Sequence, residues 1–227
     1  MNKLCALIVL AFSAWVLADA TDNEIFLEQS GDTLTLTIDQ VGFGNKFCGT
    51  ISSGACASDM MITGSNITFN VDQIGNSNQL YGPIVLSNSN IDMVFTGDSN
   101  VYDWNIGGNS AASNLDLDLT VTGSSNSWNV DIGANQSATF LNYDLTLTGD
   151  SNVFTTVVDS SNVKWDWTIT GGNNDINTLQ KDADQLLTAE FSGSDGDIDI
   201  VQQSGTCPQG TSSCSGIINI DITSDDA

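Results

Sequence analysis

A glycine recurs inside one alternating pattern along the chain, and this repeat constrains the fold more than any other feature of the sequence. Apolar and polar residues alternate before each glycine, and the alternation resumes after it. The glycines are separated by 33, 33, 26, 26, 22 and 22 residues, and they are Gly31, Gly64, Gly97, Gly123, Gly149, Gly171 and Gly193. A minimal period that tolerates insertions is typical of solenoid rungs. The sequence therefore predicts similar units stacked along one axis.

The alternation has the two-residue period of a half-buried β-strand. Leu117, Leu119 and Val121 precede Gly123 with polar residues between them, and Trp128 continues the same phase after the glycine. Because the phase survives the turn, both strands are expected to direct their apolar side chains to one interior. The fold class expected is all-β: a β-solenoid of about seven stacked strand-turn-strand rungs, with loop insertions in the early rungs.

Two columns of turns are expected between these strands. The first column contains Gly97, Asn100, Gly123, Asn126, Gly149, Asn152, Gly171 and Asn174, and the second contains Gln40, Gly42, Asn45, Gln73, Gly75 and Asn78. Glycine and asparagine tolerate the left-handed backbone of tight turns. In rungs stacked about 4.8 Å apart, the asparagines would align and hydrogen-bond one another as a side-chain ladder. We interpret both columns as structural turns rather than as ligand-binding sites.

The first twenty residues have the features of a secretory signal peptide. Lys3 gives a positive start, residues 4–17 are mostly apolar, and Ala18-Asp19-Ala20 is a small-x-small cleavage site. A membrane anchor is the competing interpretation, but this apolar run is shorter than the roughly 20 residues that a spanning helix needs. The expected domains are the signal peptide, 1–20, and the solenoid, 21–227, without a transmembrane segment after cleavage. The expected location is extracellular or at the cell surface.

The charge balance excludes some classes of partner. The chain has 28 acidic residues, four lysines, no arginine and no histidine, for a formal net charge of -24. Nucleic acid is not an expected partner, because neutralising phosphates requires basic side chains. Asp118, Asp144 and Asp166 are expected to project outward on neighbouring rungs, where repulsion would make assembly depend on salt. Calcium bridging and a simply solvated acidic face are the two interpretations, and no loop here has a recognised calcium-binding pattern. No cofactor or metal is therefore assigned.

Four cysteines remain after the signal peptide. Cys48 and Cys56 are neighbours in one Gly/Ser-rich loop, and Cys207 and Cys214 are neighbours in another. In an oxidising compartment this spacing predicts two local disulfides. A four-cysteine metal site is the alternative, but it lacks the close Cys-x-x-Cys spacing.

The turn sequences also resemble a known family. The Gln-x-Gly-x-x-Asn half repeats at residues 40–45 and 73–78, the minimal period of 22 and the secretion signal resemble curlin, the repeat protein of bacterial curli fibres. The resemblance implies a β-solenoid that self-associates through its end rungs into amyloid-like fibres of an extracellular matrix or biofilm and mediates adhesion. It also implies a nucleator or a secretion pore as a partner. Ile218, Ile220 and Ile222 are expected to form a closing half rung at the end of the stack.

Two other functions are compatible with the sequence. A monomeric solenoid could serve as an adhesin, or as an ice-binding surface protein through a threonine grid formed by Thr120, Thr122, Thr146, Thr148, Thr168 and Thr170. Threonine is also simply a good residue for an exposed strand. Catalysis is not expected, because the chain has no histidine and no serine in a nucleophile elbow with a base available.

Overall fold

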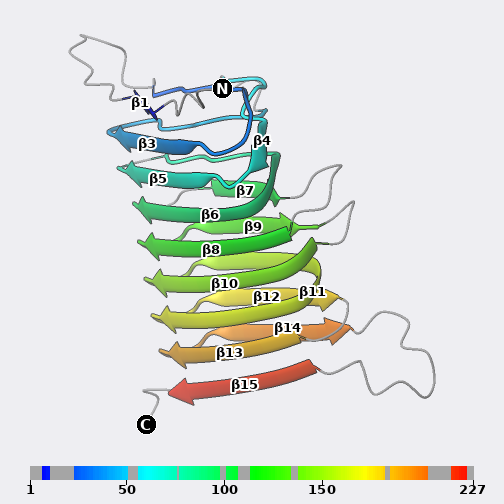
Figure 1. The fold of residues 1–227 in the computed structure, drawn as a ribbon. Coiled ribbons are helices and arrows are strands. Elements are labelled where there is room, and N and C mark those ends of the chain that lie inside the picture. The colour runs from blue at the N-terminus through cyan, green and yellow to red at the C-terminus, as the bar shows by residue number, and fades with distance from the viewer. Residues whose placement is uncertain are drawn as a thin grey trace, which may run out of the picture.

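The computed structural model describes residues 7–10, 23–50, 56–75, 77–97, 101–106, 113–133, 138–181, 185–203 and 216–223. All regular secondary structure in these ranges is β-strand, and the strands stack one above another along a single axis (Figure 1). They are β1 Leu7–Leu10, β2 Gln29–Ser30, β3 Thr35–Val41, β4 Ile62–Ser65, β5 Thr68–Ile74, β6 Ile84–Thr96, β7 Val101–Ile106, β8 Ser113–Thr122, β9 Ser127–Ile132, β10 Ala138–Thr148, β11 Val153–Thr170, β12 Asp175–Lys181, β13 Gln185–Ser192, β14 Asp197–Gln203 and β15 Gly216–Thr223.

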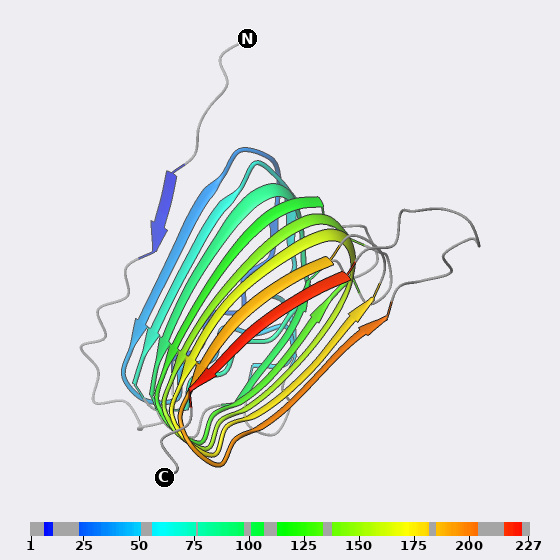
Figure 2. The same ribbon diagram turned by 90° about the horizontal axis from the view of Figure 1, so that it is seen from below.

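The strands form two parallel faces that enclose a shared interior (Figure 2). Face A consists of β3, β5, β6, β8, β10, β11, β13 and β15, stacked in that order. Face B consists of β7, β9, the first half of β11, β12 and β14. Strands β6 and β11 continue around the bend between the faces, and β2 and β4 stack above the start of β6. This arrangement confirms an all-β solenoid, with about five complete turns, so the expected count of seven rungs was only approximate.

The interior is filled by the apolar residues that alternate along each strand. In β3 the exposed and buried residues alternate without exception. The four buried tryptophans Trp104, Trp128, Trp165 and Trp167 are almost fully shielded from solvent. Trp167 stacks on Trp165 with ring centroids 4.7 Å apart, and it lies in register with the small Ala189 of the next rung. The interior therefore accommodates bulky rings in one rung by placing a small residue in the next.

The register of the first two rungs differs from the one that the sequence predicts. Gly31 pairs by position with Gly64, and Gly64 pairs with Leu86 rather than with Gly97. The glycine stacked next to Gly97 is Gly75. The Gly75 N–H donates to the Thr96 carbonyl oxygen, and the Gly97 N–H donates to the Thr122 carbonyl oxygen of the following rung. The coil has two bends, one from face A to face B and one from face B to face A. A glycine between two alternating strands occurs at both bends, so the local sequence does not distinguish one bend from the other. The expectation that all seven glycines form one column is therefore wrong.

The corrected register also changes the position of the insertions, but not the expected half rung at the end of the stack. The column of glycines at the turn from face A to face B has spacings of 33, 22, 26, 26, 22 and 22 residues, and it runs through Gly42, Gly75, Gly97, Gly123, Gly149, Gly171 and Gly193. One interval, not two, carries the eleven-residue insertion. At the other end, β13 and β14 form the last strand-turn-strand unit, and β15 stacks on β13 in face A, where the sequence predicts a closing half rung.

Two further observations concern the proposed leader and membrane insertion. Leu7–Leu10, inside the expected signal peptide, forms β1, which pairs in parallel with β3. Among the described ranges there is no helix with the length and apolar character needed to cross a bilayer.

Candidate functional site

A buried column of asparagines lies at the turn from face A to face B. It contains Asn45, Asn78, Asn126, Asn152 and Asn174, each no more than 4% exposed. The two turn columns expected from the sequence therefore meet in one continuous column, with the residues of the second set at its start. Asn100, expected in the same column, lies outside the described residues.

The asparagines of the later rungs hydrogen-bond from rung to rung. The backbone N–H of Asn126 donates to Oδ1 of Asn152 at 2.9 Å, and the backbone N–H of Asn152 donates to Oδ1 of Asn174 at 2.9 Å. Nδ2 of Asn152 also donates to the Asn174 Oδ1, at 3.1 Å. In the first two rungs, by contrast, Nδ2 of Asn45 and of Asn78 donates to the carbonyl oxygen of a glutamine five residues earlier. The column thus satisfies buried backbone groups at the turns, which would otherwise lack partners.

The glycines beside this column allow the backbones of neighbouring rungs to approach closely. Gly149, Gly171 and Gly193 have φ values of 140°, 132° and 154°, in the region that favours glycine. A Cβ atom added at Gly171 would lie 2.1 Å from the carbonyl oxygen of Gly149. These positions therefore require glycine both for conformation and for space.

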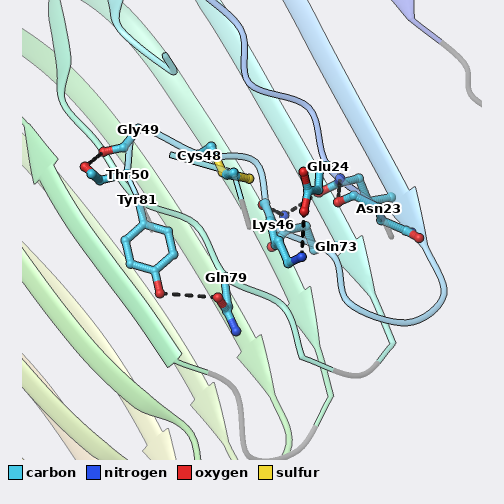
Figure 3. The surroundings of a disulfide bond; sticks show 11 residues. Asn23, Glu24, Lys46, Cys48, Gly49, Thr50, Gln73, Gln79 and Tyr81 are labelled. Atoms are coloured by element: carbon cyan, nitrogen blue, oxygen red, sulfur yellow. Dashed lines mark hydrogen bonds and ion pairs between the residues drawn. A yellow bond between two sulfur atoms is a disulfide. The ribbon is translucent and has the colours of Figure 1, made fainter. Parts of the chain in front are cut away.

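The first rungs carry a polar cluster that sequence reasoning found only in part. Gln40 and Gln73 are buried, and Nε2 of Gln73 donates to Oε1 of Gln40 at 2.5 Å and to the Lys46 carbonyl oxygen at 2.9 Å. The ammonium of Lys46 pairs with the Glu24 carboxylate at 2.7 Å (Figure 3). The glutamines were expected as turn residues, whereas the ion pair was missed because its partners are 22 residues apart. The cluster joins the irregular segment before β2 to the first full rung.

A disulfide joins Cys48 to Cys56 close to this cluster, as the sequence predicts (Figure 3). Their Cα atoms are 5.9 Å apart, and the Cys48 side chain is completely buried. The disulfide closes the start of the insertion between the first two rungs, beside the buried Phe47. The second expected pair, Cys207 and Cys214, lies outside the described residues.

A column of aspartates runs along the outer surface of face A. Asp92, Asp118, Asp144 and Asp166 occupy the same register position on four consecutive strands. Burial, and then the charges of Asp116, Asp144 and Asp92, raise the pKa of Asp118. Burial and the charges of Asp39 and Asp92 likewise raise the pKa of Asp72. Within the described ranges, no three acidic, cysteine or histidine side chains are grouped closely enough to hold a metal ion.

The raised pKa of Asp118 predicts that acidification stabilises the fold. A carboxyl group whose pKa is higher in the folded state binds protons more tightly there, so its favourable contribution is present at low pH and is lost as the pH rises through the folded pKa. We therefore expect the melting temperature to fall as the pH rises through the region just above the ordinary aspartate value of 3.8. Asp118→Asn should raise the melting temperature at neutral pH and reduce this dependence. Asp32→Asn, away from the column, is the control, and an unchanged pH profile in Asp118→Asn would contradict the assignment.

Threonines form a grid beside the aspartate column. Thr120, Thr146 and Thr168 share one register position, and Thr122, Thr148 and Thr170 share another. Neighbouring hydroxyls are therefore separated by about 4.8 Å between strands and about 6.7 Å along a strand. Apart from the intermediate Thr120, these threonines are exposed. The grid is uncharged, although a line of carboxylates borders it.

The last turn leaves apolar core positions open to solvent. Ile218, Ile220 and Ile222 of β15 are 41%, 41% and 60% exposed, because no strand among the described residues stacks beyond β15. They occupy the same register positions as Leu187, Ala189 and Phe191, which are buried. A recess at this end is lined by apolar side chains that include Phe191, Ile198 and Ile222. In the part of the chain that the structure describes, the end of the stack thus combines a strand edge that has no partner strand with exposed apolar side chains of the interior.

No family model, curated protein or solved structure matches this chain.

Proposed function

We propose that the secreted chain is a structural protein whose copies stack end to end into curli-like, amyloid-like fibres of an extracellular matrix, where they mediate adhesion. The observation that supports this proposal most directly is the open last turn. Within the described residues β14 pairs only with β12 and β15 only with β13, so their outer edges have no partner strand, and Ile218, Ile220 and Ile222 offer exposed apolar surface beside them. A long, exposed, apolar edge strand is a template for another chain.

The two ends of the coil are compatible in register. If a second copy continued face A, its Leu36 would follow Ile218 and its Ile38 would follow Ile220, because these residues belong to the same two inward columns. Each contact would join two apolar side chains. A head-to-tail contact of this kind does not close on itself, so it generates a filament rather than a closed oligomer.

Face B gives the same register at this junction. Gln180 and Gln202 are stacked, and Nε2 of Gln202 donates to Oε1 of Gln180. At the opposite end of the coil, Gln29 occupies the same register position as Gln180 and Gln202. A second copy would therefore place its Gln29 next to Gln202 and extend the glutamine ladder. The edge of β3, which β1 occupies in the full chain, would be available after cleavage at the expected site.

Repulsion between acidic residues at the junction should make assembly depend on salt concentration and pH. The same continuation would place Asp39 of one copy next to Asp221 of the other, and the whole chain has a formal net charge of -24. Like charges at neighbouring positions repel, and salt screens them. Assembly should accelerate as salt rises or as pH falls.

The test compares an end-rung variant with a side-face variant of the secreted chain. Ile220→Lys places a charge at the apolar end, whereas Thr146→Lys places the same charge on the exposed middle of face A. At micromolar concentration, the wild type and Thr146→Lys should form fibres with cross-β diffraction and amyloid-dye binding. Ile220→Lys should remain monomeric, or assemble at least tenfold more slowly. Persistent wild-type monomers at all salt and pH conditions, or equal assembly by Ile220→Lys, would refute the proposal.

The threonine grid favours a second candidate, a monomeric ice-binding surface protein. Its support is the in-register array of six threonines, because a regular lattice of hydroxyl and methyl groups can order water. The experiment is thermal hysteresis of the wild type and of Thr146→Lys. Activity that Thr146→Lys abolishes would support this candidate, and absence of wild-type activity would eliminate it. A monomeric adhesin that binds a surface without stacking is the remaining alternative, and the assembly experiment separates it from fibres.

A further inference from the structure

Six rungs place a left-handed residue at the same bend, where the chain passes from face B to face A. The residues and their φ values are Thr33 at 61°, Asn66 at 54°, Asn88 at 47°, Asn114 at 51°, Phe140 at 56° and Asn162 at 57°. The strand pairings on either side of the bend place all six in register. Asparagine suits this conformation because its short polar side chain can bond locally, whereas phenylalanine does not.

Phe140 is unfavourable here for two independent reasons. Its backbone is held in a conformation that bulky residues rarely adopt. Its side chain is 59% exposed, so the ring gains little from burial. Phe140 also interrupts the amide column, in which Nδ2 of Asn114 donates to Oδ1 of Asn88 at 2.7 Å. A strained and exposed aromatic residue that replaces the locally preferred one is an outlier from which a function can be inferred.

The surroundings of Phe140 form a shallow, widely open groove, close to a flat surface, on the outside of the coil. Its lining includes Phe140, Asn114, Asn162, Asp116, Asn142 and Lys164. Nδ2 of Asn142 donates to Oδ1 of Asp116 at 2.7 Å, which fixes these two side chains relative to each other. The exposed amides of Asn114 and Asn162 lie on the rungs on either side of Phe140. An aromatic ring is therefore bordered by planar groups that both donate and accept hydrogen bonds.

We propose that this groove binds a neutral polysaccharide, with a pyranose ring against the face of Phe140. A pyranose presents C–H groups on one face and hydroxyl groups around its edge. The electron-rich face of an aromatic ring attracts the C–H groups, and amide and carboxylate side chains bond the hydroxyls. Stacked rungs would also let a long chain lie along the axis of the coil.

The charges of the molecule favour a neutral glycan over an acidic one. The formal net charge of the chain is -24, and a polyanion would be repelled by it. Lys164, the cation in the groove, lies 3.6 Å from the Asp166 carboxylate, which reduces its attraction for another anion. The proposal is independent of fibre formation, because the groove belongs to the side of a single coil.

The test uses Phe140→Asn, which introduces the residue type found at this position in four of the other five rungs, Thr33 being the exception. Affinity electrophoresis of the secreted chain would be run in gels that contain hydroxyethyl cellulose, galactomannan or alginate. We expect retardation of the wild type by at least one neutral polysaccharide and at least tenfold weaker binding by Phe140→Asn. The same variant should melt about 2 to 4 °C higher, because it relieves the left-handed strain. A loss of binding together with a gain in stability excludes misfolding as its cause.

Phe43→Ala is the matched control, because Phe43 is also 59% exposed but lies at a different turn. Its binding should equal that of the wild type. The proposal is overturned if no neutral polysaccharide retards the wild type, if alginate alone does, or if Phe140→Asn and Phe43→Ala behave alike.

Discussion

Gly171→Ala is expected to destabilise the solenoid by more than about 4 kcal/mol, enough to prevent folding of many domains. The added Cβ would lie 2.1 Å from the carbonyl oxygen of Gly149 and 2.6 Å from its carbonyl carbon. The backbone cannot retreat without breaking the bond from the Gly171 N–H to the Ser192 carbonyl, which is 2.8 Å long. The left-handed φ of 132° adds about 1 to 2 kcal/mol of strain. Chemical denaturation followed by circular dichroism measures the total.

Gly31→Ala is the matched control for this experiment. Gly31 has a similar φ of 150°, but the nearest atom to an added Cβ is Nε2 of Gln29, at 3.8 Å. Its expected cost is the conformational strain alone, about 1 to 2 kcal/mol. The difference between the two variants therefore isolates the contact between rungs. Equal effects at Gly31 and Gly171 would show that the close approach of the rungs is wrong.

The second large effect is expected from Asn152→Ala in the buried asparagine column. The substitution removes the Oδ1 that accepts from the Asn126 N–H and the Nδ2 that donates to Asn174. The buried Asn126 N–H would lose this acceptor, and removing the acceptor of a buried donor costs about 1 to 3 kcal/mol. The expected loss of stability is about 2 to 4 kcal/mol. Hydrogen exchange at Asn126 should accelerate in parallel.

Asn177→Ala provides the comparison, because Asn177 is an exposed asparagine on the outer side of β12. A change of less than about 0.5 kcal/mol is expected there. If Asn152→Ala were as mild as Asn177→Ala, the column would consist of turn residues without a stabilising ladder.

Some contacts of particular residues could be predicted from the sequence, and others could not. The phase of Leu117, Leu119 and Val121 was sufficient to predict the inward face of β8, because a two-residue period has only two possible phases. The pairing of Cys48 with Cys56 followed from proximity in the chain. The ion pair of Lys46 with Glu24 could not be predicted, because the coil alone brings these residues together.

The two candidate sites also differ in how well the sequence predicted them. The asparagines of the turns were recognisable from their spacing, although their division into two columns was wrong. Phe140 was not recognisable at all, because its significance depends on φ and on the four asparagines in register with it, Asn66, Asn88, Asn114 and Asn162. Periodicity reports which side of a strand a residue occupies, but it does not report which rung lies above it.

The sequence by itself thus determined the class of fold, the inward and outward residues, and the residue types of the turns, since these follow from local alternation and backbone preference. Only the tertiary structure decided which bend each glycine occupies, which asparagines share hydrogen bonds and which positions remain uncovered at the end of the stack. These depend on the register between rungs, and the register is fixed by the packing of the interior and by the close approach of backbones at Gly149 and Gly171.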